Sequence, residues 1–440
     1  MSNEQQKDRY DLIDVKRVAL VGIFPSGQSD IECQEHLDEL RELAWTYGFE
    51  VAERFACPIK KLNAATFIGA GKAEEIGIFA ENQEIDAVIF DEEISPNQQK
   101  NLESLIKKPV LDRTELILEV FAQRAQTREA GLQIELARIR YQLPRLKRMW
   151  THLSREKTGG GGTSAFRGAG EQQIEVDRRI LKTRVAALEK EIKEIREQRK
   201  TQRSSRLRSG VPTFAIVGYT NAGKSTLLNS LTGAGVLEED KLFATLDTTA
   251  RQFNLPNHQK IILIDTVGFI RKLPHGLVAA FRSTLEEAVF TDILLHVVDV
   301  AHPQAMDHAE ETLKVLKELK ADDRPIITLL NKSDLVEDES VFMKFRVKFP
   351  HSIQISAKKR EGFDLLYEMI EERLKSLRKH VHLRIPQSEY ALASELIKEG
   401  NVLFSDYEGN DILMEVEVPS RLEHKVRPFI VTSIHAEDSP

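Results

Sequence analysis

Hydrophobic residues recur with two different periods in the first part of the chain. Short apolar runs of the kind that form buried strands alternate with segments that have the three-to-four spacing of an amphipathic helix. The strands are expected at residues 17–23, 86–90 and 110–111, and the helices at residues 35–46, 72–82 and from Ser95-Pro96 onward. Because strands that alternate with helices form parallel sheets, residues 1–125 are predicted to be a small α/β domain.

Two stripes of large apolar residues follow, each with the alternating spacing of three and four that packed helices use. The first is Leu132, Leu136, Ile139, Leu143, Leu146, Trp150 and Leu153, and the second is Leu181, Val185, Leu188, Ile192 and Ile195. A glycine-rich break at residues 159–170 separates the stripes, and Pro144 should kink or end the first helix. Residues 126–209 are therefore predicted to form an antiparallel helical hairpin with a flexible tip.

The remaining chain divides into a larger and a smaller unit. Apolar strands near residues 213–217, 250–254, 260–265, 292–299, 325–330 and 352–355 alternate with helical segments. We therefore expect a second α/β domain at residues 210–378. After a turn at residues 408–411, every second residue from Ile412 to Val418 is apolar, as in a hairpin strand with one buried face. Residues 379–440 are predicted to be a small α+β unit in the order β-α-β-β.

Composition indicates a globular protein of two to four domains and excludes several other classes. Of the 440 residues, 41% are hydrophobic and 30% are charged, and no apolar stretch approaches the ~18 residues that a membrane helix needs. The polar N-terminus contains no signal-peptide core. Cys33 and Cys57 are the only cysteines, which argues against a disulfide scaffold and leaves no zinc-finger spacing. We expect a cytoplasmic monomer without a membrane span.

Charge is distributed very unevenly. The whole chain carries a net charge of −7, yet residues 136–209 contain 20 Lys and Arg against 8 Asp and Glu. This segment therefore carries +12 and the rest carries −19, which marks one basic module on an acidic protein. The hairpin is expected to expose Arg138, Arg140, Arg145, Lys147, Arg148, Arg178, Arg179, Lys182 and Arg184.

The basic hairpin and its glycine-rich tip admit two interpretations. The tip could approach a phosphate surface closely, and Phe166 could stack on an exposed base. Alternatively, the tip is a solvated linker whose charges only aid solubility. We favour RNA binding, because the positive charge is concentrated beside the most glycine-rich part of the chain. The candidate RNA contacts are Arg155, Lys157, Phe166, Arg167, Arg178 and Arg179.

A phosphate-binding loop lies just after the hairpin. The segment Gly218-Tyr219-Thr220-Asn221-Ala222-Gly223-Lys224-Ser225 fits G-x-x-x-x-G-K-[ST], and it lies between an apolar strand and a helical segment, as the motif requires. Its glycines allow a tight turn whose N–H groups point at phosphate oxygens, and the helix N-terminus adds a positive dipole. Lys224 would reach the β- and γ-phosphates, and Ser225 would hold Mg²⁺.

Four further motifs follow this loop. They are Phe243-Ala244-Thr245-Leu246-Asp247, Asp265-Thr266-Val267-Gly268, Asn331-Lys332-Ser333-Asp334 and Ser356-Ala357-Lys358. Thr245 could complete the Mg²⁺ shell, Asp265 could reach Mg²⁺ through water, and the Gly268 N–H could reach the γ-phosphate. Asp334 could accept hydrogen bonds from guanine N1–H and N2–H, whereas adenine would leave its carboxylate unpaired. The last motif could close over the base, so the ordered set predicts a P-loop GTPase domain.

The expected catalytic set lacks one group. Ras-type GTPases have a Gln after the D-x-x-G motif that orients the attacking water, but Phe269 occupies this position and cannot align a water by hydrogen bonding. Hydrolysis should therefore be slow unless a catalytic group comes from elsewhere. Asn221 offers one source, because GTPases with Asn at this position often bind K⁺ beside the phosphates; alternatively, Asn221 only stabilises the loop. The candidate catalytic residues are Asn221, Lys224, Thr245 and Gly268.

With these motifs the chain resembles the HflX family of ribosome-associated GTPases over residues 17–378. The resemblance rests on the segments FAQRAQTRE (121–129), LQIE (132–135), RGAGE (167–171), DRR (177–179) and DTVGFIRKLPH (265–275). The chain departs from the family at the hairpin tip, which is longer than usual and has Ala169 where a Pro is common. The C-terminal unit resembles an extra domain that some members carry.

The resemblance implies several properties. They are binding to the large (50S) ribosomal subunit, a hairpin that reaches ribosomal RNA near the peptidyl-transferase centre, GTP hydrolysis stimulated by the ribosome, and a role in splitting or rescuing stalled ribosomes. A role in ribosome biogenesis stays open. The expected ligands are GTP, GDP and Mg²⁺, with K⁺ as a further candidate.

Two other functions fit the same motifs. A GTPase that assists RNA modification would also suit Asn221, but it should need an enzyme partner and ignore ribosomes. A nucleotide-independent RNA-binding or remodelling protein should bind RNA equally in its apo, GDP and GTP states. The presence of both Asp334 and Thr245 argues against this last alternative.

Overall fold

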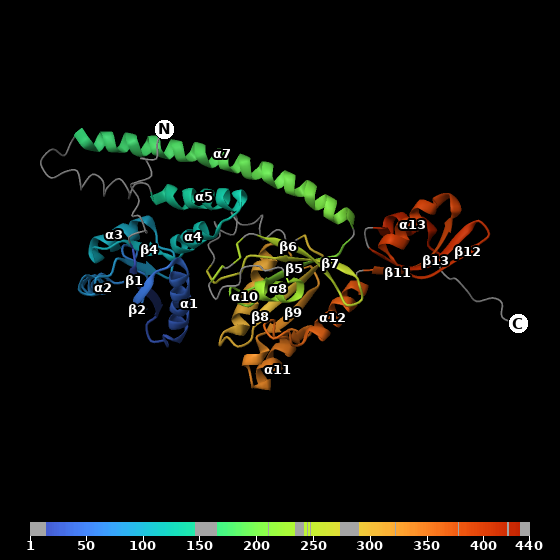
Figure 1. Ribbon diagram of the computed structural model, residues 1–440. Helices are drawn as coiled ribbons and strands as arrows, with labels where there is room; N and C mark the ends of the chain where they lie inside the picture. The colour runs from blue at the N-terminus through green and yellow to red at the C-terminus, as the bar shows by residue number, and fades with distance from the viewer. Residues whose placement is uncertain are drawn as a thin grey trace.

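Figure 1 shows the computed structural model as three separate sheets in a row, with one long helix running over the first toward the second. The structure describes residues 15–145, 165–209, 211–233, 242–243, 245–246, 248–272, 290–321, 323–376, 378–419 and 422–431. Its architecture confirms the predicted α/β class with an α+β unit after it. Within these ranges, no helix is both long and apolar enough to cross a bilayer.

The first sheet is parallel and has the strand order β2-β1-β3-β4. The strands are β1 (Arg17–Pro25), β2 (Glu50–Ile59), β3 (Ala87–Phe90) and β4 (Val110–Asp112), and the helices are α1 (Ile31–Tyr47), α2 (Ala70–Asn82), α3 (Pro96–Ile106) and α4 (Arg113–Arg124). Gly48 ends α1 with a left-handed φ of 113°, and Ser95 forms a capping box with Gln98 at the start of α3. Strand β2 is not predicted by the sequence pattern, because it lies at the sheet edge and buries only Cys57.

The helical hairpin is built from two helices and a short turn. These are α5 (Arg128–Gln142), the 3-10 turn η1 (Leu143–Arg145) and α7 (Ala165–Ser209). The described parts of the two apolar stripes meet as predicted, and the buried residues between the helices are Leu132, Leu136, Ile139, Leu188 and Ile192. Three other predicted stripe positions, Leu146, Trp150 and Leu153, lie outside the described residues. The α-helix also ends before Pro144, because proline cannot donate the next backbone hydrogen bond.

The prediction of a flexible break over residues 159–170 is wrong at its C-terminal end, because α7 already begins at Ala165. Phe166 and Arg167 therefore belong to the helix. Gly168 and Gly170 interrupt a segment of otherwise acceptable helix formers, and an interior glycine costs a helix only about 1 kcal/mol. Arg155 and Lys157, two predicted RNA contacts, lie outside the described residues.

Arg145 is buried, so the prediction that it is exposed is wrong. Its guanidinium lies 3.3 Å from the Asp112 carboxylate, donates to the Ile94 carbonyl at 2.7 Å and stacks 3.6 Å from the Tyr141 ring centroid. Asp112 is fully buried, and a buried carboxylate needs a charged partner and hydrogen bonds. Arg145 therefore joins the hairpin to the first domain instead of facing solvent.

Several other hairpin arginines form ion pairs within the protein. The pairs are Arg128–Glu191, Arg138–Glu119, Arg140–Glu189, Arg184–Glu135 and Arg199–Glu129. In the part of α7 whose side chains are described, Arg178, Arg179 and Lys182 remain exposed, and none of them has an ion pair. Lys190 and Lys193 are exposed and form no ion pair in the described structure either, so positive charge is available along the whole described part of α7.

The second sheet has six strands in the order β10-β9-β8-β5-β7-β6, and only β6 is antiparallel to its neighbour. The strands are β5 (Thr213–Gly218), β6 (Thr249–Asn254), β7 (Lys260–Asp265), β8 (Ile293–Asp299), β9 (Ile326–Asn331) and β10 (Ser352–Gln354). The described helices are α8 (Lys224–Thr232), α10 (Ala305–Glu318), the 3-10 turn η2 (Ser333–Leu335), α11 (Glu339–Lys348) and α12 (Phe363–Ser376). Since β5, β7 and β9 are parallel, the motifs that follow them meet at one edge of the sheet.

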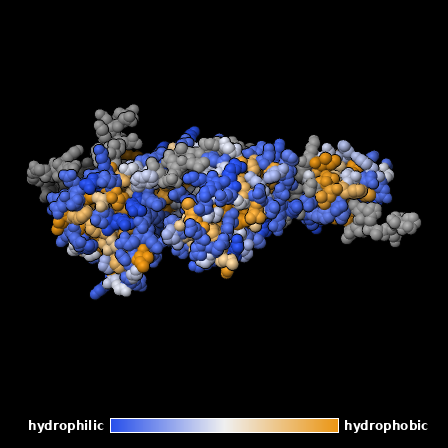
Figure 2. All heavy atoms as spheres, turned by 60° about the horizontal axis from the view of Figure 1, so that its bottom comes forward, coloured by the Kyte–Doolittle hydropathy of each residue, from blue (hydrophilic) through white to orange (hydrophobic). Residues whose placement is uncertain are grey.

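The C-terminal unit is a small antiparallel sheet in the order β11-β13-β12. Its elements are β11 (Arg378–Pro386), η3 (Gln387–Glu389), α13 (Tyr390–Glu399), β12 (Asn401–Glu408), β13 (Asp411–Pro419), α14 (Glu423–Val426) and η5 (Arg427–Phe429). The predicted alternation is confirmed, because Ile412, Met414, Val416 and Val418 are all buried. Figure 2 shows apolar surface on this unit as well, and Leu403 and Phe404 of β12 are exposed.

The first domain and the second α/β domain share one hydrophobic core. Phe121 on α4 packs edge to face on Phe243, with ring centroids 4.6 Å apart, and Phe269 lies in the same cluster. Leu37 and Leu40 of α1 complete the side that belongs to the first domain. A shared apolar core fixes two domains against each other more firmly than a polar contact would.

A buried histidine lies in the middle of β8. The His296 side chain is fully buried beside Phe349, and in the described structure neither ring nitrogen has a hydrogen-bond partner. Burial lowers the pKa of His296 to about 4, because the charged imidazolium would lose its hydration. The folded protein therefore keeps this ring neutral.

We expect His296 to make the stability of the second α/β domain pH-dependent. Below pH 6.5 the unfolded chain binds a proton that the folded chain refuses, so stability falls as the pH drops from 6.5 toward 4. The full loss is about 3 kcal/mol. Urea unfolding of wild type and His296→Leu at pH 7 and pH 5 measures the part of this loss that falls between these pH values, about 2 kcal/mol. An equal pH dependence in both proteins would contradict this assignment.

Candidate functional site

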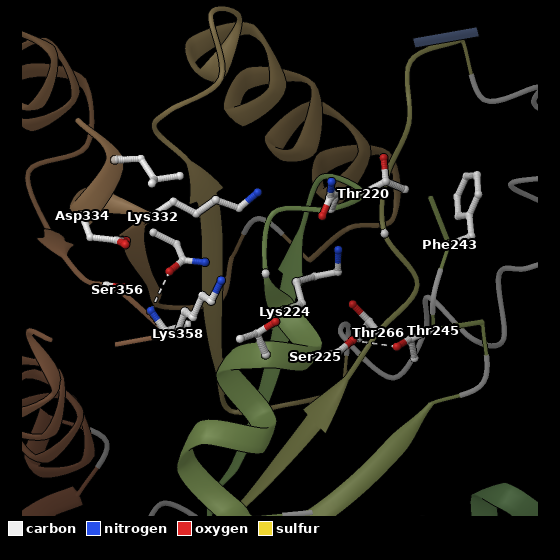
Figure 3. A pocket seen from close by; sticks show the side chains of 17 residues that line it. Thr220, Lys224, Ser225, Phe243, Thr245, Thr266, Lys332, Asp334, Ser356 and Lys358 are labelled. Carbon is white, nitrogen blue, oxygen red and sulfur yellow. Dashed lines mark hydrogen bonds between the residues drawn. The ribbon is translucent and has the colours of Figure 1, made fainter. Parts of the chain in front are cut away.

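A cavity of about 480 Å³ opens at the carboxyl ends of β5, β7 and β9. Its lining residues are Thr220, Asn221, Gly223, Lys224, Ser225, Thr226, Phe243, Thr245, Thr266, Gly268, Asn331, Lys332, Asp334, Leu335, Ser356, Ala357 and Lys358. Figure 3 shows Asp334, Ser356 and Lys358 on one side of Lys224, and Ser225 and Thr245 on the other. The cavity therefore has two chemically different ends.

Two glycines give the phosphate-binding loop its shape. Gly218 has a φ of 153°, and a Cβ atom there would lie 2.3 Å from the Val297 carbonyl oxygen. Gly223 has a φ of 93°, and its Cβ would lie 2.3 Å from Asn331 Nδ2. Neither position can accept a side chain, so the loop backbone stays close to β8 and β9 and leaves the cavity open at the start of α8.

Lys224 is buried at the first residue of α8. Its Nζ donates to the Tyr219 carbonyl at 2.6 Å. Burial lowers the pKa of Lys224 to about 8, although the nearby Asp265 carboxylate opposes the shift. A buried ammonium with a single neutral hydrogen-bond acceptor is poised to exchange that acceptor for an anion.

Three oxygen-bearing side chains converge at one end of the cavity. Ser225 Oγ lies 2.7 Å from Thr245 Oγ1 and donates to Asp265 Oδ2 at 2.8 Å. Burial raises the pKa of Asp265, although Lys224 and the hydrogen bonds from Ser225 and Thr245 oppose this shift. Hydroxyl and carboxylate oxygens are the ligands that Mg²⁺ prefers, so this cluster can hold a divalent ion.

The opposite end of the cavity is built by Asn331, Asp334 and Ser356. Asn331 donates to the Ala222 carbonyl at 2.8 Å and accepts from the Ala357 N–H at 2.9 Å, which ties the phosphate-binding loop to the last motif. A hydrogen bond from Ser356 lowers the pKa of Asp334, so its carboxylate stays ionised. An oriented carboxylate at this place can accept two hydrogen bonds from the N1–H and N2–H edge of guanine.

Not every predicted residue lines the cavity. Gly218, Tyr219, Ala222, Leu246, Asp265, Val267 and Ser333 are not among the lining residues, and Ala244 and Asp247 lie outside the described part. Thr226 and Leu335 line the cavity although the motifs do not single them out. Each directly follows a predicted residue in the sequence, so the backbone turn that places the motif at the cavity also places the next residue there.

Phe269 does not face the reacting phosphates. Its side chain is only 1% exposed and lies in the core that the two domains share. Its N–H donates to the Gly218 carbonyl at 3.1 Å, and its carbonyl accepts from the Thr220 N–H at 2.8 Å. The residue after the D-x-x-G motif is thus fixed in the interior, where it cannot orient a water.

The first domain contacts the loops around the cavity directly. Tyr219 hydrogen-bonds Glu39 of α1 through its hydroxyl, while its ring stacks on His308 of α10 in its own domain, with centroids 3.7 Å apart. The Leu242 N–H donates to Thr46 Oγ1 at 3.1 Å, next to the Phe121–Phe243 contact. The side chain of Tyr219 therefore points away from the cavity and toward the first domain.

Comparison with known proteins agrees with this geometry. Three families match consecutive parts of the chain: "GTP-binding GTPase N-terminal" at residues 34–122, "GTP-binding GTPase Middle Region" at 124–206 and "50S ribosome-binding GTPase" at 213–332. The chain is 49% identical to the GTPase HflX of Chlamydia pneumoniae over 96% of this chain and 90% of that protein. It is 44% identical to the GTPase HflX of Caldanaerobacter subterraneus over 95% of both chains.

Among solved structures, the chain is similar to a GTP-binding protein from Sulfolobus solfataricus in complex with GDP. The two are 29% identical, and the match covers 82% of this chain and 100% of that one, with a TM-score of 0.44.

We expect Asp334→Asn to change the base preference of the cavity. The amide would present an N–H where guanine also has donors, so GDP affinity should fall about 100-fold or more. Xanthine has a carbonyl at C2, so xanthosine diphosphate should bind to the variant more tightly than it binds to the wild type. Titration of both nucleotides by calorimetry tests this. Asp338→Asn, which keeps the N-cap of α11, is the matched control and should change neither affinity.

Proposed function

This chain belongs to the HflX family of GTPases, and we propose that it is a cytoplasmic GTP-gated switch that binds the large ribosomal subunit. One observation carries the proposal: a single cavity joins a cluster of magnesium-type oxygens, at Ser225 and Thr245, to a guanine-type carboxylate at Asp334. This arrangement matches the two ends of GTP.

We propose that the loop from Gly218 to Ser225 and the N-terminus of α8 bind the phosphates through backbone N–H groups. On binding, Lys224 would exchange the Tyr219 carbonyl for oxygens of the β- and γ-phosphates. The lowered pKa of Lys224 supports this role, because a bound anion would stabilise the charged ammonium that burial destabilises. Asp334, with Ser356 and Lys358 beside it, would select guanine.

The residues present fit Mg²⁺ as the cofactor. Ser225 and Thr245 would hold the ion directly, and Asp265 would hold it through water, since its carboxylate already accepts from Ser225. When bound, the ion would neutralise charge that develops on the phosphates. Thr245 and Gly268 would then contact the γ-phosphate side, so both loops would be ordered only with GTP.

The proposed gate extends into the first domain. Phe243 and Phe269 belong to the two loops that would sense the γ-phosphate, and both lie in the shared core. A change in either loop after hydrolysis would therefore disturb packing against α1 and α4. The hairpin is joined to the same domain by the buried Arg145–Asp112 pair, so nucleotide state could reach the RNA-binding arm.

The missing catalytic group has two candidate sources in this proposal. Asn221 lies exposed at the mouth of the loop with a left-handed φ of 58°, and it could take part in holding K⁺ beside the phosphates. The ribosome is the second source. The buried position of Phe269 supports the idea that the chain alone is slow.

Ribosome binding is proposed from three lines of support. The matching family for residues 213–332 is described as a 50S ribosome-binding GTPase, and the relatives are named HflX. The exposed, unpaired Arg178 and Arg179 offer charge for phosphate contacts on ribosomal RNA. Splitting or rescue of stalled ribosomes and a step of ribosome biogenesis both use this binding. If titration with ribosomal subunits shows no binding, the alternative is a GTPase that assists RNA modification.

We expect purified large ribosomal subunits to raise GTP hydrolysis by orders of magnitude. The measurement is phosphate release in Mg²⁺ buffer containing either K⁺ or Na⁺, with and without subunits. A rise with subunits in both salts places the catalytic help in the ribosome. A rise with K⁺ alone, which Asn221→Ala abolishes, places it at the loop. Lys224→Ala should lose GTP-dependent subunit binding, and its retention would contradict the gate.

We expect the double variant Arg178→Gln/Arg179→Gln to weaken binding to large subunits and to lower its salt dependence. Each lost phosphate contact should reduce the slope of log affinity against log salt by roughly 1. Lys344→Gln/Arg346→Gln, which removes two exposed charges from α11, is the matched control for net charge. Equal effects in the two double variants would mean that α7 makes no specific contact with the subunit.

A further inference from the structure

The outer face of the C-terminal sheet carries a group of three metal-type ligands. They are His380 and His382 on β11 and Glu415 on β13, and one ligand atom from each lies within 4.8 Å of the other two. None of the three residues belongs to a motif of the GTPase domain. It lies just beyond the point where α12 passes into β11.

The sheet register brings these three side chains together. Val381, Leu383 and Ile385 of β11 are buried, so the alternate residues His380 and His382 share the opposite face. On β13, Met414 and Val416 are buried and Glu415 lies between them. Glu415 is the register partner of His382 in the antiparallel ladder. Backbone pairing therefore places the ligands beside one another.

The contacts within the cluster leave ligand capacity unused. His380 Nε2 lies 2.8 Å from Glu415 Oε1. The His380 and His382 rings are 5.2 Å apart at their centroids, and they do not stack, because their planes differ by 59°. His382 Nδ1 is buried and has no hydrogen-bond partner in the described structure. A buried imidazole nitrogen without a hydrogen-bond partner is unfavourable, and a bound metal ion would satisfy it.

The geometry points to a zinc-binding site made by His380, His382 and Glu415, with water as the fourth ligand. Zn²⁺ is bound by histidine nitrogen and carboxylate oxygen at roughly 2.0–2.2 Å in tetrahedral sites, so its ligand atoms lie roughly 3.3 Å apart. A spacing of up to 4.8 Å would therefore have to close by about 1.5 Å, a change within the reach of side-chain rotation on two paired strands. Two imidazoles and one carboxylate favour zinc over Mg²⁺ or Ca²⁺, which take mainly oxygen ligands.

A metal here would act on the C-terminal unit alone. Its ligands come from the edge strand β11 and the central strand β13, so the ion would link two strands that are already paired in the sheet. The unit has a core of modest size, and metals commonly stabilise units of this kind. The site would also stiffen β11, the strand that leads out of the GTPase domain.

Cobalt substitution tests the site directly. The untagged full-length chain is held in saturating Mg²⁺ and GDP, so that the nucleotide cavity is occupied, and is titrated with Co²⁺ and then Zn²⁺. We expect one ion per chain, the intense visible bands of tetrahedral Co²⁺, and their replacement by Zn²⁺. Amide hydrogen exchange should slow in β11 and β13 and stay unchanged in β5.

Single variants decide whether these residues are the ligands. His382→Gln and Glu415→Gln should each weaken Zn²⁺ binding about tenfold or more, whereas the exposed His351→Gln should bind as wild type does. Glu415→Asp, which keeps the carboxylate, should retain part of the affinity and guards against a folding defect. GDP binding should be unchanged in all four variants. A weak octahedral Co²⁺ spectrum, or affinity that ignores His382 and Glu415, would overturn the site and leave His380–Glu415 as an ordinary ion pair.

Discussion

The close approach of the loop backbone at Gly218 and Gly223 to β8 and to the Asn331 side chain is the constraint on which the rest of the site depends. Any side chain at either position would collide with β8 or with Asn331, so the loop lies flat against the carboxyl ends of the sheet. Asn331 then spans from the loop to the last motif with two hydrogen bonds. Phosphate end and base end are thus held at a fixed separation before any nucleotide arrives, which lowers the ordering cost of binding.

The first domain is part of the same construction. Tyr219 belongs to the phosphate-binding loop, yet its hydroxyl and ring contact Glu39 and His308 instead of the cavity. Arg113 is buried beside Glu39 and Asp91, and Lys272 reaches Asp91 from the other domain. Breaking one partner of such a buried charge network is costly, because the remaining charge is left in a poorly solvated place. Separation of the two domains would therefore expose the buried charges of this network to the loss of a partner.

Local patterns in the sequence predict those parts of the molecule whose causes are local. The strand–loop–helix order around Lys224, the αL stop at Gly48 and the alternation from Ile412 to Val418 all follow from short-range rules. The oxygen cluster follows as well, since parallel strands end at one edge. Short-range rules do not predict β2, whose strand character comes from its neighbour β1.

Tertiary contacts explain the remaining differences between the structure and the predictions from the sequence. The sequence pattern predicts Arg145 to be an exposed cation, but its guanidinium is buried because it pairs with the buried carboxylate of Asp112. The aromatic contact between Phe121 and Phe243 joins residues 122 positions apart, and no spacing rule signals it. Helix α7 begins at Ala165 because the cooperativity of helix formation outweighs the free-energy cost of Gly168 and Gly170 in the helix. The amino-acid composition of the segment alone does not predict this outcome.

Helix α7 has a mechanical consequence. Its 45 residues correspond to a rod of about 68 Å at 1.5 Å per residue. Only residues 210–212 separate its C-terminal end from β5, the strand that leads into the phosphate-binding loop. A tilt of about 5° at that end would displace the opposite end by about 6 Å. A rigid helix of this length would therefore amplify a small rotation near the phosphate-binding loop into a displacement of several ångströms at its far end.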